Sequence, residues 1–446
     1  MKKILFILFI SLCYISGIAQ SVKITGTQFI EVIPEASSGL SAVYVLRDAS
    51  TAKISYTSRN SNVLWQRYSN LGGGYAEDIT DVTHSNNEYS INANSSDMGY
   101  IITDGNRQTC LWVVNYATYD NVDINTLEAV SSDCNSVILR VDDSAECIAY
   151  YTITGRREVL DREFKLKYNT LEYSETDGIY NQISKEETLP WFDNEISTDV
   201  PLCDTEFILT SDRFASEWSG GEEVISSTFQ TSAVQAQTSA TQTLREADNE
   251  QKVESELGGS APCEITFKAA VTDAAIYRRW EISTYPDFNE VDLLFTDLEV
   301  IHTFNDAGTT YVRFVSNNAE GTCEYIGDTY TISIGDSRLE CPNAFSPGAS
   351  EGVNDLWKVS YRSIISFNCQ IFNRWGQKII ELTDPSQSWD GTYKGKLVKS
   401  GTYFYVIKAR GADNKDYELS GHINIMETGN NPTGSGSAED DFPVME

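Results

Sequence analysis

The chain has 446 residues, and its 65 Asp and Glu outnumber its 33 Lys and Arg, which gives a formal net charge of −32. Such a charge repels the phosphate backbone of a nucleic acid, so we expect no nucleic-acid partner. The acid is unevenly spread, because residues 341–426 contain ten Lys and Arg against eight Asp and Glu. The C-terminal region therefore differs electrostatically from the rest of the chain.

The chain opens with the pattern of a secretory signal peptide. Lys2 and Lys3 precede an apolar run over 4–18, and the small residue Ala19 stands before Gln20. The apolar run is too short to anchor the chain in a bilayer, and no later stretch reaches the length of a membrane helix. We therefore expect residues 1–19 to be removed during export and no membrane-spanning segment to remain.

Short runs of β-branched and aromatic residues, bounded by Gly, Asn, Asp and Ser, recur along the chain, whereas helical periodicity is nearly absent. The predicted strands of the first half are 41–46, 100–103, 110–116, 136–141, 148–154, 164–173 and 207–210. So many strands in a chain of this length indicate several small domains in series. The sequence predicts an all-β fold of serial immunoglobulin-like β-sandwich modules that ends in a small C-terminal β-sandwich.

Two segments after residue 200 leave alternatives open. The first starts at Pro201, and its apolar residues Cys203, Phe207, Leu209 and Trp218 fit the inward-facing start of another immunoglobulin-like sheet. The second, over 231–257, is rich in Ala, Thr, Gln and Glu, and it fits a helix, an extended hairpin or a stalk.

From residue 261 the strand pattern sharpens. Residues 263–271 and 277–283 form two predicted strands, the second of which carries Trp280, and a His-Thr-Phe element at 302–304 precedes a Gly-Thr-Thr-Tyr-Val run at 308–312. This order resembles the polycystic-kidney-disease-type immunoglobulin-like domain over about 261–335. The acidic glycine turn of that family is replaced here by Glu281, Ile282 and Ser283, so the resemblance implies a fold and no function.

The last folded region carries four motifs in a fixed order. They are Pro-Asn-Ala-Phe-Ser-Pro at 342–347 with Asn-Asp at 354–355, Phe-Asn-Arg-Trp-Gly at 372–376, Trp-Asp-Gly at 389–391 and Gly-Thr-Tyr at 401–403. Taken together they resemble the gliding-motility-associated C-terminal domain, the type B sorting domain of type IX secretion, over residues 341–426. The resemblance implies that the type IX secretion machinery is a partner. The candidate sorting residues are Pro342, Asn343, Phe345, Pro347, Asn354, Asp355, Phe372, Asn373, Arg374, Trp375, Gly376, Trp389, Asp390, Gly391, Gly401 and Tyr403.

The same region can be interpreted as a compact sandwich without reference to a family. Residues 373–376 and 390–391 supply turns between apolar runs. The expected aromatic core consists of Phe372, Trp375, Trp389, Tyr403 and Tyr405. At 348–351 the oxygen-rich loop of the family is replaced by Gly-Ala-Ser-Glu, which has lost ligands that calcium prefers. The low-complexity acidic residues after this domain, at 428–446, are expected to be disordered.

Removal of the signal peptide leaves eight cysteines, an even number that suggests disulfides in an exported chain. We expect Cys341 to pair with Cys369 and Cys263 with Cys323, because each pair falls within one predicted module. The connectivity of the other four stays open, namely Cys110, Cys134, Cys147 and Cys203.

Catalytic and metal-binding signatures are weak. The cysteine spacing and the three widely separated histidines do not fit a zinc site. Asp120, Asp123 and Asn125 resemble part of a calcium loop but lack its Gly and Glu. The triple glycine at 72–74 lacks the Lys and Ser or Thr of a phosphate-binding loop, so it fits a turn better. We expect no cofactor, no metal and no catalytic residue.

Seven segments follow from these patterns. They are a signal peptide (1–19), an immunoglobulin-like β module (20–125), a second β module (126–200), a further β segment with a polar linker (201–260), the polycystic-kidney-disease-like domain (261–336), the sorting domain (337–427) and a disordered acidic tail (428–446).

The preferred function is that of an exported structural or adhesive protein, secreted or held on the outer face of the outer membrane of a Gram-negative cell after passing through the periplasm. Its upstream modules would bind a surface glycan or a protein. Two alternatives stay open: a secreted glycan-active or other hydrolase carried by the same sorting domain, and an accessory component of the gliding or secretion apparatus.

Overall fold

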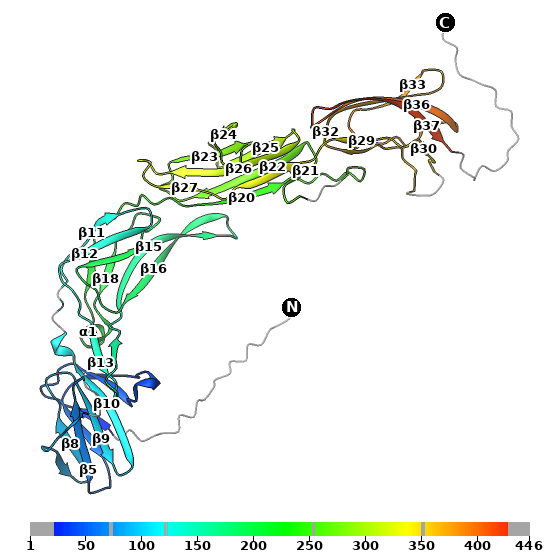
Figure 1. The fold of residues 1–446 in the computed structure, drawn as a ribbon. Coiled ribbons are helices and arrows are strands. Elements are labelled where there is room, and N and C mark those ends of the chain that lie inside the picture. The colour runs from blue at the N-terminus through cyan, green and yellow to red at the C-terminus, as the bar shows by residue number, and fades with distance from the viewer. Residues whose placement is uncertain are drawn as a thin grey trace. The chain divides into compact units, whose positions relative to one another are not determined.

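Figure 1 shows the computed structural model, which describes residues 22–70, 75–119, 122, 124–251, 255–348 and 353–426. The predicted signal peptide, the acidic tail, the triple glycine, Asp120, Asp123 and most of the loop at 348–351 lie outside these residues. The chain divides into two units, Met1–Glu172 with Asn181–Ala233 and Tyr173–Tyr180 with Val234–Glu446. Almost every regular element is a strand, which confirms the predicted all-β class.

Unit 1 begins with a two-sheet sandwich. Its central strand β3 reads Ala-Val-Tyr-Val-Leu and is buried throughout, because both faces of its sheet are covered. Tyr44 and Leu46 face the core between the sheets, whereas Val43 and Val45 face a second core formed with later elements. One sheet has the order β1 (Val22–Thr25), β4 (Lys53–Thr57), β8 (Glu88–Asn92) and β7 (Thr83–Ser85). The other has the order β2 (Phe29–Val32), β3 (Ala42–Leu46), β10 (Arg107–Asn115), β9 (Met98–Asp104), β5 (Val63–Tyr68) and β6 (Glu77–Asp78), with short 3-10 turns at Ala36–Ser38 and Tyr116–Thr118.

The second sandwich of unit 1 extends further than the sequence predicted. Its strand β18 (Ile208–Thr210) pairs with β15 (Phe164–Ser174), and β19 (Glu223–Ile225) pairs with β18, so residues 201–225 complete this sandwich and do not start another sheet. Phe207 and Leu209 point into its core as expected, but Trp218 lies on the short helix α1 (Arg213–Ser219). The elements are β11 (Leu127–Ser132), β12 (Ser136–Val141) and β17 (Glu195–Asp199) in one sheet, β16 (Ile179–Leu189), β15 (Phe164–Ser174), β18 (Ile208–Thr210) and β19 (Glu223–Ile225) in the other, and the hairpin β13 (Ile148–Tyr151) with β14 (Arg157–Leu160).

A buried ion pair joins the two sandwiches within unit 1. Arg162 lies between β14 and β15, and its Nε donates to the Asp212 carboxylate at 2.6 Å, where both side chains are 1% exposed. The remaining guanidinium nitrogens donate to the carbonyls of Glu146 and Tyr119, each at 3.1 Å. Asp212 also accepts from the Tyr116 hydroxyl at 2.9 Å. The pair is therefore almost fully hydrogen-bonded, which is the condition for burying charge at tolerable cost.

Unit 2 begins with an immunoglobulin-like sandwich. The open question about 231–257 is partly answered by β20 (Ala236–Gln242), which pairs along its length with β22 (Cys263–Val271). Trp280 lies on a predicted strand, which pairs with neighbours on both sides, and it is 0% exposed. One sheet contains β20 (Ala236–Gln242), β22 (Cys263–Val271) and β25 (Glu299–Phe304); the other contains β21 (Gly258–Gly259), β28 (Tyr330–Ile334), β26 (Gly308–Asn317), β23 (Tyr277–Ser283) and β24 (Leu293–Phe295), with β27 (Glu324–Ile326) beside β26.

The C-terminal domain completes unit 2. Its main sheet packs a core that includes Trp357, Trp389 and Ile371, each 0% exposed. That sheet has the order β30 (Ala344–Phe345), β37 (Asp416–Ile425), β36 (Gly401–Gly411), β32 (Ile364–Phe372) and β33 (Lys378–Leu382), and two short pairs flank it, β29 (Arg338–Glu340) with β31 (Ser360–Arg362) and β34 (Thr392–Tyr393) with β35 (Lys396–Leu397).

The segment that precedes β21 packs on the C-terminal domain. The Asn249 side chain is buried, and its Nδ2 donates to the carbonyls of Val359 and Pro385, each at 2.8 Å. The amide of Gln251 donates to the Tyr361 carbonyl at 2.7 Å. This polar stretch therefore ties the immunoglobulin-like sandwich to the domain that follows it, a role that its composition alone did not indicate.

Candidate functional site

The candidate sorting residues divide into a buried set and an exposed set. Phe345 lies on β30 and is 3% exposed, and its ring packs 5.3 Å from that of Trp389. The backbones of Trp357 and Trp389 exchange two hydrogen bonds of 2.8 Å, and the Trp357 indole donates to the Pro342 carbonyl at 2.8 Å. These motif residues hold the domain together, because their side chains fill its core.

The Trp-Asp-Gly motif closes a turn at the edge of this core. Asp390 accepts from both the amide and the hydroxyl of Thr392, at 2.9 and 2.8 Å. Gly391 has φ +76°, and a Cβ there would come within 2.8 Å of the Pro347 ring, so only glycine fits. The motif is therefore needed for folding.

Asn354 and Asp355 support the loop that follows Pro347. The Ser346 amide donates to the Asn354 carbonyl at 2.9 Å, and the Gly348 amide donates to the Asp355 carboxylate at 3.0 Å. Asn354 takes φ +56°, a left-handed conformation that Asn tolerates well. Asn354 therefore contributes through its backbone and its side chain is exposed, whereas Asp355 contributes through its carboxylate.

The Asn-Arg-Trp-Gly motif forms an exposed turn between β32 and β33. The Asn373 side chain accepts from the amides of Trp375 and Gln377, each at 3.0 Å, and Gly376 has φ +79°. The Arg374 guanidinium lies 4.2 Å from the Trp375 ring centroid. The expectation that Trp375 belongs to the aromatic core is wrong, because its side chain is 73% exposed. The turn has no core beneath this position, so the indole projects into solvent.

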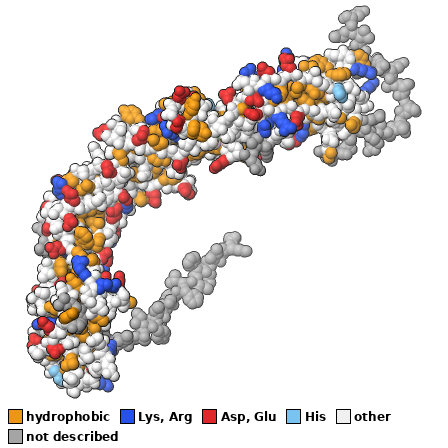
Figure 2. Space-filling model, in the orientation of Figure 1, with side chains coloured by type: hydrophobic (Ala, Val, Ile, Leu, Met, Phe, Trp, Pro, Cys, Tyr) orange, Lys and Arg blue, Asp and Glu red, His pale blue; other side chains and the backbone are white. Residues whose placement is uncertain are grey.

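A second turn lies beside the first. The side-chain Nε2 of Gln377 donates to the Tyr393 hydroxyl at 3.2 Å, and the Lys394 ammonium lies 5.3 Å from the Tyr393 ring centroid. Lys394 and Lys396 are exposed. We call Arg374, Trp375, Tyr393, Lys394 and Lys396 the basic tip. Figure 2 shows that Lys and Arg side chains are mixed with Asp and Glu over this domain, in contrast with the net acidity of the whole chain.

The last two candidates lie at the start of β36. Gly401 has φ +144°, which favours glycine, and the Tyr403 hydroxyl donates to the Lys399 carbonyl at 3.0 Å. The Tyr403 ring packs 5.4 Å from Trp389. Phe372 is only partly buried. Sequence reasoning missed Tyr393, Lys394 and Lys396, although three basic or aromatic residues in four positions of an acidic chain could have marked them.

The cysteines differ from the predicted pairs. The structure contains a disulfide at Cys323, but Cys263 is free, so the predicted Cys263 to Cys323 pair is wrong. Cys263 lies on β22 and faces the core of the sandwich, whereas Cys323 lies in the turn before β27. Cys341 and Cys369 are also free, so their predicted bond is not formed here. Of the cysteines left open, Cys134 is bonded, and Cys110 and Cys147 are free.

We expect Cys341 and Cys369 to resist thiol reagents in the folded protein. Burial raises the pKa of Cys369 to about 12, with a further contribution from Cys341, which leaves about one part in ten thousand as thiolate at pH 8. Burial also raises the pKa of Cys341, against a hydrogen bond from Tyr405. Timed alkylation followed by mass spectrometry should label the half-buried Cys147 long before either. A peptide in which Cys341 is disulfide-linked to Cys369 would contradict the expectation.

Within the described residues, no group of three or more His, Cys, Asp or Glu side chains is placed to hold a metal ion. In the same part of the chain, no helix is long and apolar enough to cross a membrane. Asn125 belongs to the candidate calcium loop, and its backbone N–H donates a hydrogen bond to the Asp142 carboxylate at 2.9 Å.

Two segments match family models. Residues 126–227 match the fibronectin type III domain, in agreement with the second sandwich of unit 1. Residues 339–425 match the CHU_C type IX secretion signal domain. This confirms the resemblance found for the last domain. These two matches indicate a non-catalytic module architecture for the segments that they cover.

No curated protein matches the chain. Among solved structures, it is similar to the crystal structure of dimeric latent PorU from Porphyromonas gingivalis, at 10% identity over 68% of this chain and 32% of that one, with a TM-score of 0.16. The chain thus spans about a third of that protein, and no inference is drawn from so low a score.

From the two family models, the chain carries a C-terminal type IX secretion signal domain preceded by β-sandwich domains, and it is exported across the outer membrane to the cell surface or beyond.

Proposed function

We propose that the chain is a non-catalytic structural or adhesive protein whose upstream sandwiches are displayed outside the cell, and that its basic tip is the surface which the type IX secretion machinery recognises. The first part is supported by the domain order, in which sandwiches of the fibronectin and immunoglobulin type precede the secretion signal. Such modules commonly present binding surfaces rather than catalytic clefts.

The observation that carries the second part is the exposure of Trp375. Trp389, in another motif of the same domain, is 0% exposed and is needed for the core, whereas Trp375 is 73% exposed and contacts Arg374 on the surface. An exposed Trp beside an Arg contributes little to folding, but Trp and Arg are among the residue types enriched at the energetic centres of protein interfaces. The tip therefore suits recognition by a protein partner.

The tip also suits an electrostatic role. Arg374, Lys394 and Lys396 are exposed on adjoining turns, and the nearby Asp390 carboxylate is occupied by its two hydrogen bonds from Thr392. A basic surface on a chain of net charge −32 can orient the chain during an encounter with an acidic partner. The proposal therefore predicts a partner surface that is acidic around an apolar pocket for the indole.

The test is cell fractionation of the full chain and of a chain that ends at Gly335. The structure sets this end point, because Leu339 on β29 belongs to the core of the C-terminal domain, so that a cut before Cys341 would leave part of the domain behind. We expect the full chain at the cell surface or in the medium and the shortened chain in the periplasm. If the shortened chain reached the cell surface or the medium in the same yield as the full chain, the proposed sorting role would be wrong.

A further inference from the structure

The outer face of the larger sheet in the immunoglobulin-like domain carries an unusual group of charges. Along β23, Trp280 and Ile282 point into the core, so alternate positions, including Tyr277, Arg279 and Glu281, lie on the outer face. The register with β26 places Arg313 opposite Glu281 and Asn317 opposite Tyr277. Residues from two strands thus meet on one exposed face.

Glu281 holds two arginines in place. Its carboxylate accepts from Arg279 Nε at 2.7 Å through one oxygen and from Arg313 Nε at 2.8 Å through the other. The Glu281 side chain is 6% exposed, and those of the arginines are 33% and 24% exposed. Burial would raise the pKa of Glu281, but the hydrogen bonds from the two arginines outweigh burial and keep its pKa below the ordinary value. The carboxylate is therefore ionised at neutral pH.

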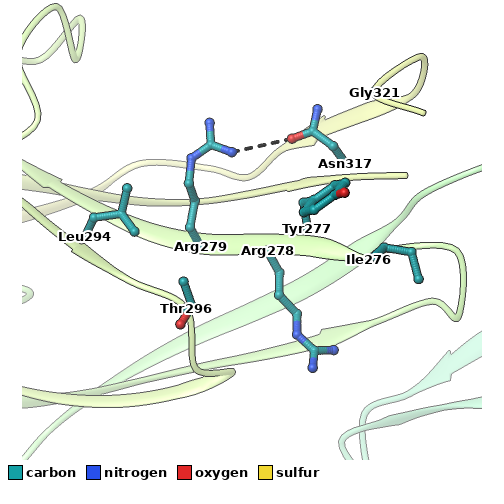
Figure 3. Close-up of a pocket in the computed structure, with 8 residues that line it drawn as sticks. All are labelled: Ile276, Tyr277, Arg278, Arg279, Leu294, Thr296, Asn317 and Gly321. Atoms are coloured by element: carbon teal, nitrogen blue, oxygen red, sulfur yellow. Dashed lines mark hydrogen bonds between the residues drawn. The ribbon is translucent and has the colours of Figure 1, made fainter. Parts of the chain in front are cut away.

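The geometry leaves both outer nitrogens of Arg313 and one outer nitrogen of Arg279 available. Arg313 stacks 4.1 Å from the Phe288 ring centroid, and Arg279 Nη1 donates to the Asn317 side chain at 3.4 Å, the dashed line in Figure 3. Among the described residues, Arg279 Nη2 and both Nη atoms of Arg313 have no protein acceptor. The Glu281 carboxylate balances one of the two guanidinium charges, and the Glu324 carboxylate adjoins the group, where it accepts from the Asn317 side-chain amide at 3.2 Å. Guanidinium Nη pairs bind planar anions such as carboxylates in bidentate geometry.

An open hollow of about 660 Å³ adjoins Arg279. Its lining includes Tyr277 and Leu294, which are 59% and 54% exposed. Figure 3 shows the guanidinium of Arg279 on the same side as Tyr277 and Asn317, whereas that of Arg278 lies on the other side of the strand. A hollow that is open to solvent accepts a segment of a polymer more readily than a small molecule, which needs enclosure. Its aromatic ring suits the apolar face of a sugar.

We propose that this face binds an acidic polysaccharide, with a uronic acid carboxylate held by Arg279 and Arg313 and a sugar ring lying on Tyr277. The proposal rests on the adhesive role proposed above, whose ligand it names by chemical class. Its test uses purified protein, so a failure of export does not enter the result.

The experiment measures binding of the purified full chain to polygalacturonate, to dextran as a neutral polymer and to poly-L-glutamate as an acidic peptide. We expect polygalacturonate alone to bind, with affinity that falls as salt is raised. Arg279→Gln with Arg313→Gln should weaken this binding at least tenfold, and Tyr277→Ala about fivefold. Lys268→Gln, which removes a positive charge from the opposite sheet, should change it less than twofold.

Near-ultraviolet circular dichroism checks that each variant keeps the packing around Trp280. Arg279→Lys, which retains the charge, should restore less than half of the lost binding free energy, because Lys lacks the planar group that donates to Glu281 and to a ligand at the same time. Equal binding of dextran, stronger binding of poly-L-glutamate, or an equal loss in Lys268→Gln would each overturn the proposal.

Discussion

Trp375→Ala is expected to strand the full chain in the periplasm, with at least a tenfold loss of surface or secreted protein, while the C-terminal domain stays folded. The indole is 73% exposed, and its described ring contact is with Arg374. Its loss should therefore cost less than about 1 kcal/mol of folding free energy, since surface substitutions of this kind have small effects. Quantitative immunoblotting of periplasm, outer membrane and medium measures the export, and thermal unfolding measures the stability.

Ile365→Ala is the matched control. Ile365 lies near the start of β32, at the opposite end of that strand from the turn at 373–376, and it is 37% exposed, so the substitution removes an exposed apolar side chain of the same domain away from the basic tip. Its export should equal that of the unaltered chain. If both variants are exported normally, the tip is not the recognised surface. If Trp375→Ala unfolds the domain as Trp389→Ala is expected to do, the indole has a structural role that its exposure does not reveal.

The failed assignment of Trp375 to the core shows what the sequence could and could not supply. The motif at 373–376 was correctly predicted as a turn, and Asn373 and Gly376 form it as expected. Because tryptophan is usually buried, its residue type favoured a position in the core. A turn, however, has no second sheet beneath it. The geometry of the turn therefore determines that Trp375 is exposed. Only this geometry, and not the average burial of tryptophan, indicates that Trp375 could contact a partner.

Strands were easier to predict than their partners. The strand at 136–141 was located to the residue, because the alternation of apolar side chains is a local property. The pairing of β18 with β15 joins residues about forty positions apart, and nothing local specifies it. The sequence therefore indicated the strand around residue 208 but assigned it to the wrong module.

The same limit applies to pairs of charges. The clamp of Glu281 on Arg313 depends on a register between β23 and β26, and the contact of Arg162 with Asp212 joins residues fifty positions apart. In a chain with so many acids, the residue types give no indication of which one will be buried. The strand pairing determines which charged residues meet, and the energetic importance of each pair can be judged only when its burial is known.

Arg162→Met is expected to lower the free energy of unfolding of unit 1 by about 3–5 kcal/mol, because it leaves the Asp212 carboxylate buried without its cation. Asp212 would retain the Tyr116 hydroxyl at 2.9 Å and the Ala215 amide at 2.8 Å, which do not neutralise it. Urea denaturation of the full chain, with hydrogen exchange to assign the change to unit 1, measures the loss.

Two comparisons decide whether burial is the cause. Arg140→Met breaks an exposed pair with Glu195 of 2.8 Å in the same unit, where the side chains are 58% and 51% exposed, and should cost less than about 1 kcal/mol. Asp212→Asn added to Arg162→Met removes the stranded charge but keeps a side-chain oxygen to cap α1, so it should recover a large part of the loss. If Arg162→Met lowered the free energy of unfolding no more than Arg140→Met does, that result would show that the junction tolerates the unpaired carboxylate. It would also show that apolar packing around Tyr116 and Phe214 holds the two sandwiches together without the ion pair.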